Sequence, residues 1–227
     1  MNSRNIVRLF ISTLLVGGIT GGIVGFAVRW DEFSSFDLVE LLSVFVWLVG
    51  VGLIFSVISQ AGFFAYLTIH RFGLGIFKSA SLWNGIQIVL IAFVLGDLVY
   101  FRYTEFADKG EGVLPFVYPA LFLLIFGAIV AYFKVKQTNK QAFIPALFFM
   151  TVITVLEWVP VLRTDDDSWL YFMLYPLLIC NVYQLLILNR LIHASQKELA
   201  EKRVNKAAVT KKMMTPKKKD KIKIKEV

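Results

Sequence analysis

The chain has 227 residues, of which 57% are hydrophobic and only 18% are charged, and its mean hydropathy is +0.68. Ordinary soluble domains carry about 25% charged residues, so this composition excludes a soluble globular protein and predicts an integral membrane protein. The net charge is +8 at pH 7, and the single cysteine excludes a disulfide framework within the chain.

Charge-poor apolar runs recur along the chain at lengths suited to a membrane, because a spanning helix needs about 20 mainly apolar residues. We expect six spans, near residues 9–28, 41–66, 82–101, 113–133, 142–162 and 169–189. The loops between them are short. The sequence therefore predicts an all-α integral membrane protein, with a six-helix transmembrane domain over 1–193 and a disordered, cytoplasmic, lysine-rich tail over 194–227.

The first span is rich in glycine and is expected to stay uncleaved, since its 20 uncharged residues exceed the apolar region of a signal peptide. Its five glycines are Gly17, Gly18, Gly21, Gly22 and Gly25. Three of them are four residues apart and share one helix face. Small residues let helices approach closely in lipid, so this face predicts packing against another helix of the bundle. Homodimerisation or docking of another protein is the alternative.

Polar side chains inside the spans are costly in lipid and mark candidate sites. If the spans alternate in direction, five amides fall in the cytoplasmic half: Gln60, Asn84, Gln87, Asn181 and Gln184. The third and sixth spans each carry two of them, three residues apart and so on one face. We expect a shared layer of interhelical hydrogen bonds, and the alternative is a small polar cavity.

Two intramembrane carboxylates, Asp97 and Glu157, lie near the outer ends of the third and fifth spans. Arg102 and Arg163 follow them and could neutralise them. We expect a structural or snorkelling role for both acids. The alternative is a cation or proton site, as a small-solute or ion transporter would need.

The sequence contains none of the catalytic motifs H-E-x-x-H, G-x-S-x-G or the P-loop. The two histidines, His70 and His193, are too few for an ordinary metal site. We expect no enzyme, no catalytic residue, no metal and no cofactor. The two halves of the chain also show no convincing internal repeat, which counts weakly against a transporter.

Basic residues are distributed unevenly between the two sides of the expected bundle. The side of the termini carries 20 of the 24 lysines and arginines, and the other side carries Arg29, Arg102, Lys109 and Arg163. The positive-inside rule then places both termini in the cytoplasm of a multi-pass plasma-membrane protein.

The tail carries 12 basic and three acidic residues between Lys197 and Lys225. Such a composition predicts disorder and attraction to anionic lipids. A solvated extension that only enforces orientation is an equal alternative. Nucleic-acid binding is not expected, since no aromatic residues interleave the lysines.

Four stretches carry a resemblance to a known family. They are "SRNIVRLFISTLLVGGITGGIVGFAVRW", "SQAGFFAYLTIHRFGLGIFKSASLWNGIQ", "NKQAFIPALFFMTVITVLEWVP" and "YPLLICNVYQLLILNRL". Together they resemble the KinB-signalling pathway activation (KbaA) family of endospore-forming bacteria, over about residues 1–193. The resemblance implies a plasma-membrane regulator of the membrane sensor kinase KinB at the start of sporulation, acting by membrane contact. It assigns no site residues, and it leaves homo-oligomerisation open.

Overall fold

A computed structural model describes residues 3–30 and 37–214, and all regular structure in these ranges is helical. The helices are α1 (Ser3–Val28), α3 (Leu38–Phe77), α4 (Ala80–Phe106), α5 (Leu114–Gln137), η1 (Lys140–Ala142), α6 (Phe143–Phe148), η2 (Phe149–Ile153), α7 (Thr154–Leu162) and α8 (Asp167–Met214). Within the described ranges, six stretches are long and apolar enough to cross a membrane, with η1 to α7 forming one of them. The predicted all-helical architecture with six candidate spans is confirmed.

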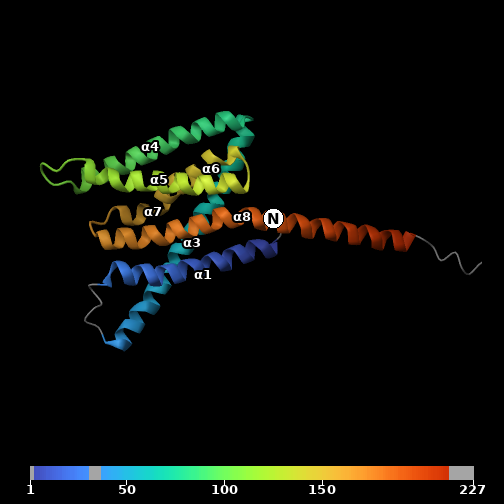
Figure 1. Cartoon of the computed structure of the whole chain (residues 1–227), viewed down its shortest axis with the longest axis horizontal. Coiled ribbons are helices and arrows are strands. Elements are labelled where there is room, and N and C mark those ends of the chain that lie inside the picture. Colours follow the sequence, from blue (N-terminus) through green and yellow to red (C-terminus); the bar gives the residue numbers. More distant parts are fainter. Residues whose placement is uncertain (1–2, 31–36, 215–227) are drawn as a thin grey trace, which may run out of the picture.

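The centre of the bundle is formed by α8 and by the composite stretch from η1 to α7. In the most apolar part of each, 61% of the residues are buried, against 22% for α3 and for α4. Figure 1 shows α1 and α4 on opposite sides of this centre. α1 packs along α3 and α8, whereas α4 packs mainly against α5 and α6.

The second span extends well beyond its predicted end. α3 begins with a capping box, in which the Asp37 backbone N–H donates to Glu40 Oε2 at 3.0 Å. It ends where Lys78 adopts a left-handed conformation (φ 51°) and donates its N–H to the Leu74 carbonyl. Its 40 residues measure about 60 Å, about twice the hydrocarbon thickness of a bilayer, and the helix crosses the bundle obliquely (Figure 1).

The fifth span changes its helical type along its length. A 3₁₀ turn precedes α6, and a π-helical segment over Phe149–Ile153 joins α6 to α7. All five residues of this π segment are buried. π-helical turns are rare and often occur at functional sites, and here the segment leads directly into the helix that carries Glu157.

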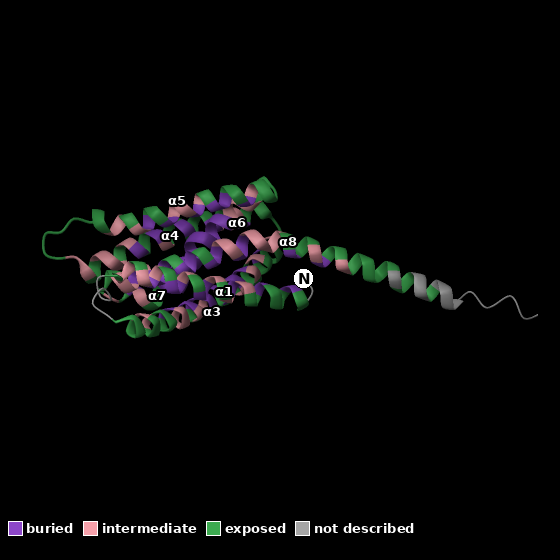
Figure 2. Ribbon diagram, turned by 60° about the horizontal axis from the view of Figure 1, so that its bottom comes forward, coloured by how far each residue is buried: buried purple, intermediate pink, exposed green. Residues whose placement is uncertain are grey.

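The predicted disorder of the tail is wrong for residues 194–214, because α8 continues to Met214 as a helical extension that leaves the bundle (Figure 2). The prediction weighed charge and neglected helix propensity. Ala, Lys, Glu and Leu are strong helix formers, and they extend a helix whose nucleation has already been accomplished in the bundle. Glu198 and Lys202 also have the favourable i, i+4 spacing. The remaining tail residues, 215–227, lie outside the described ranges.

Candidate functional site

The glycines of α1 lie against α3. A Cβ atom at Gly17 would overlap the Ser56 side chain, and one at Gly21 would overlap the Gly52 backbone. Conversely, a Cβ at Gly52 would lie 2.7 Å from the Gly21 Cα. Gly18 and Gly22 meet Leu53, Val49 and Phe45 of α3, while Gly25 meets Leu48 and also Phe172 of α8. All five are therefore occupied by neighbours within the chain.

A buried polar group lies where α3, α7 and α8 meet. We call it the Glu157 cluster, and its members are Ser56, Ser59, Gln60, Thr154, Glu157, Asn181 and Gln184. None is more than 6% exposed. Such a concentration of polar groups inside an apolar bundle requires mutual hydrogen bonding, because lipid and apolar side chains offer no partners.

Asn181 is the centre of this cluster. Its Nδ2 donates to Glu157 Oε2 at 2.6 Å and to Thr154 Oγ1 at 3.0 Å, and its Oδ1 accepts from Ser59 Oγ at 2.7 Å. Gln184 Nε2 donates to the same Ser59 Oγ at 2.6 Å. One amide of α8 thus links α3 to α7.

A second arm of the cluster reaches α1. Gln60 Nε2 donates to Ser56 Oγ at 3.2 Å, and Ser56 Oγ donates to the Thr13 carbonyl at 2.9 Å. The side-chain oxygens Gln60 Oε1, Gln184 Oε1 and Glu157 Oε1 have no partner among the described residues. The hydrogen-bonding capacity of the cluster is therefore only partly used.

Glu157 points into the bundle and not toward its end. Helical side chains lean toward the N-terminus of their own helix, and α7 starts in the bundle centre, so its carboxylate leans inward to Asn181. The carboxylate packs directly over Gly62 of α3, where a Cβ atom would overlap Oε1. The snorkelling expected from the sequence would require the opposite direction.

The Glu157 cluster differs from the amide layer expected from the sequence. Gln60, Asn181 and Gln184 take part, but Asn84 and Gln87 of α4 form no hydrogen bond with them among the described residues. Asn84 is half-buried, and Gln87 is fully buried with neither amide atom partnered.

The helix arrangement explains this difference. α4 packs on α5 and α6 and is remote from the centre of α8. The hydroxyl members, Ser56, Ser59 and Thr154, were missed, although the i, i+3 spacing of the two serines was a usable signal.

The two arginines also differ from expectation. Asp97 lies exposed on α4, outside the Glu157 cluster. Arg102 donates to the carbonyls of Leu162 and Thr164, at 3.2 and 2.9 Å, and lies 3.8 Å from Asp167. Arg163 is exposed. Neither arginine neutralises the acid expected of it.

No group of three His, Cys, Asp or Glu residues in the described ranges is placed to hold a metal ion. His70 is held by Trp83, whose Nε1 donates to its Nδ1 at 3.1 Å. The Glu157 cluster is built from groups that bond to one another. Its arrangement suits a brace between helices.

The comparisons with known proteins identify a family. Residues 17–191 match the model of the KbaA family, described as KinB-signalling pathway activation in sporulation. A KinB-signaling pathway activation protein from Bacillus subtilis (strain 168) is 51% identical over 194 residues, which cover 84% of this chain and 98% of that relative. No solved structure matches. This similarity supports a role in activating the KinB pathway, and the chain belongs to the KbaA family.

Proposed function

We propose that this protein activates a KinB-type membrane sensor kinase by lateral contact between helices within the bacterial plasma membrane, with both termini in the cytoplasm. The described connections between helices hold only two to seven residues. Apart from the α8 extension, the described part of the chain therefore offers a partner mainly the outward helix faces of the bundle. Family membership supports the pathway, and the exposed helix faces support lateral contact as its mode.

The outward face of α4 supports this proposal most directly. Gly85, Ala92 and Gly96 are exposed there, and a Cβ atom at either glycine would meet nothing within 4 Å. Close helix packing uses such small residues. Asp97 adjoins this face and is exposed, and a carboxylate facing lipid is costly. A partner helix with a donor or a cationic group opposite Asp97 would remove that cost.

The glycines of α1 contribute to the proposed contact only indirectly, by packing the helices of the bundle together. Their side of the helix is filled by α3 and α8, so a kinase helix would have to displace part of the bundle to reach them. We therefore assign the proposed contact to α4, and we assign the Glu157 cluster the role of an internal brace between α3, α7 and α8.

The test is a bulky substitution on α4 in a spore-forming host. Gly96→Leu should reduce KinB-dependent induction of early sporulation genes at least about tenfold, because the added side chain prevents close helix approach. Membrane abundance and the detergent unfolding midpoint should stay unchanged. Gly50→Leu is the matched control, since Gly50 of α3 also has nothing within 4 Å.

Normal induction by Gly96→Leu would reject the α4 contact. A transporter predicts a different pattern, with solute-dependent loss of function in Glu157→Gln and none in Gly96→Leu. Co-purification of the tagged kinase in mild detergent, lost in Gly96→Leu and kept in Gly50→Leu, would distinguish direct contact from an indirect effect.

A further inference from the structure

A cavity of about 320 Å³ lies at the end of the bundle where α3 turns into α4 and α5 turns into η1. This volume is at the lower end of the range for small-molecule sites. The polar residues that line the cavity are Tyr66, His70, Asn84, Lys134, Asn139 and Gln141. They come from four different helical segments and the short connection at Asn139. We call this the Lys134 cavity.

Lys134 is a buried cation without an ionic partner among the described residues. It is 7% exposed, and its Nζ donates to the Leu185 carbonyl at 2.5 Å. An ammonium group has three donors, so two remain for other partners. A buried charge is costly unless it is paired, and no Asp or Glu lines the cavity.

The neighbouring side chains also present donors. His70 Nδ1 accepts the Trp83 indole N–H at 3.1 Å, so the proton of a neutral His70 imidazole lies on Nε2, which acts as a donor. The amides of Asn84, Asn139 and Gln141 supply further N–H groups. One turn along α4 from Asn84, buried Gln87 leaves both of its amide atoms without a partner in the described chain.

The opposite end of the bundle provides a contrast. A cavity of about 330 Å³ there also contains a mostly buried cation, Arg102, but three carboxylates line it: Glu111, Asp165 and Asp167. That cavity therefore supplies carboxylates for its own cation. The Lys134 cavity has a similar size and a more deeply buried cation, but no acid lines it, so the partner that it lacks is an anion.

We propose that the Lys134 cavity binds a phosphate group, contributed either by an anionic lipid headgroup or by a free phosphate compound. The Lys134 ammonium supplies the charge, and His70 Nε2–H with the amides supplies hydrogen-bond donors to the phosphate oxygens. The rest of the wall is apolar, with Leu67, Leu74 and Leu188, and suits the glycerol and upper acyl region of a lipid. This site is independent of the α4 contact.

The test uses the purified full chain in a neutral maltoside detergent and measures the unfolding midpoint during titration. One arm compares sodium phosphate with sodium chloride at equal ionic strength. The other arm compares short-chain phosphatidylglycerol with diacylglycerol of the same acyl chains. Ligand that binds the folded state raises the midpoint as its concentration passes Kd.

Lys134→Gln should weaken phosphate or phosphatidylglycerol binding at least about tenfold, because it removes the charged donor. Lys136→Gln is the matched control, since Lys136 is exposed and lies over the Tyr132 ring, and it should change binding less than about twofold. Asn84→Asp places a carboxylate in the lining at constant size, and should weaken binding similarly even if Lys134→Gln does not fold.

Stabilisation in both arms supports a site for the phosphate group as such. Stabilisation by phosphatidylglycerol alone assigns it to the lipid headgroup, and stabilisation by inorganic phosphate alone assigns it to a free phosphate compound. Stabilisation in neither arm overturns the proposal. Equal binding by folded Lys134→Gln or Asn84→Asp also overturns it.

Discussion

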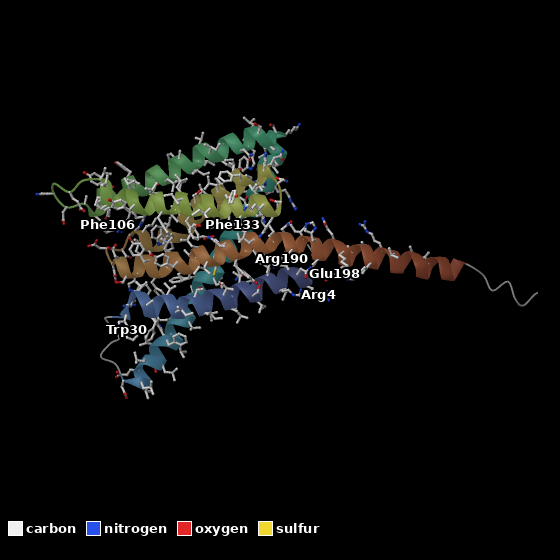
Figure 3. The ribbon with its side chains drawn as sticks, viewed as in Figure 1. Arg4, Trp30, Phe106, Phe133, Arg190 and Glu198 are labelled. Atoms are coloured by element: carbon white, nitrogen blue, oxygen red, sulfur yellow. The ribbon has the colours of Figure 1, made fainter. Side chains whose placement is uncertain are left out.

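α1 and α4 both lie at the outside of the bundle and both carry glycines, but these glycines meet different surroundings. The five of α1 contact α3 or α8 so closely that an added Cβ would overlap a neighbour. Gly85 and Gly96 of α4 meet nothing within 4 Å. Figure 3 shows the arrangement of the helices, with α1 lying along α8 from Trp30 to Arg4 while α4 rises away from that pair.

The role of a glycine in a membrane helix therefore depends on the residues that face it. α1 meets small residues on α3, Gly52 and Ser56, and the two backbones approach until no space remains. α4 has no such counterpart within the described chain. The first pattern therefore builds the fold, and the second leaves an open helix face, where the contact proposed above would lie.

The largest expected loss of stability comes from filling the space at a glycine of α1. Gly21→Leu forces a branched side chain into the Gly52 backbone, which cannot move aside as a flexible side chain could. We expect the free energy of unfolding to fall by about 3 kcal/mol or more. Gly96→Leu should change it by less than about 0.5 kcal/mol, since that position is open.

Denaturant-induced unfolding in detergent, followed by circular dichroism, measures both changes. Wild-type stability in Gly21→Leu would contradict the close α1–α3 contact. Comparable loss in the two variants would contradict the distinction between a filled and an open face.

A moderate loss of stability is expected from substitutions of Glu157 in the Glu157 cluster. Glu157→Ala removes one acceptor of the Asn181 amide and leaves space beside Gly62, and should cost about 1–3 kcal/mol of unfolding free energy. Glu157→Gln keeps an acceptor oxygen at the same reach and should cost less than about 1 kcal/mol. Unfolding in detergent measures both variants.

Signalling in the same variants separates a brace from a transport site. A structural brace predicts that signalling in the host follows folded abundance in both variants. Failed signalling in Glu157→Gln at full abundance would favour the transporter and contradict the brace.

The sequence alone predicted the positions of the helices better than the contacts between them. Hydropathy and length are local properties, and they located the six candidate spans. The family followed from the resemblance of four sequence stretches. The Glu157 cluster depends on which helix faces which, and no local pattern places Glu157 against Asn181 or keeps Asn84 away from both. The inward lean of Glu157 follows from the direction of α7, which is known only once the π segment and α7 are placed.

The tail shows the opposite error, because a local property was neglected. Its lysines predicted disorder, but residues such as Ala200 and Leu199 favour a helix that α8 has already started. Attraction of the tail to anionic lipids stays a prediction, as does the cytoplasmic placement of both termini.

The smallest expected losses of stability concern two contacts between the N-terminal end of α1 and α8. There Asn5 Nδ2 donates to Ser195 Oγ at 2.8 Å in a buried contact, and Arg4 pairs with Glu198 (Figure 3). Asn5→Ala should cost about 1 kcal/mol of unfolding free energy, because it removes a buried hydrogen bond. Glu198→Gln should cost less than about 0.5 kcal/mol, because the Arg4 side chain is 68% exposed and exposed ion pairs contribute little.

Salt separates these two contacts. The effect of Glu198→Gln should vanish when unfolding is measured at about 1 M salt, where exposed charges are screened within about 3 Å. The effect of Asn5→Ala should persist, since a hydrogen bond between neutral groups does not depend on ionic strength. If both effects vanished together, α1 would be held to α8 by charge alone at this end, and the close packing seen along its glycines would stop before Asn5.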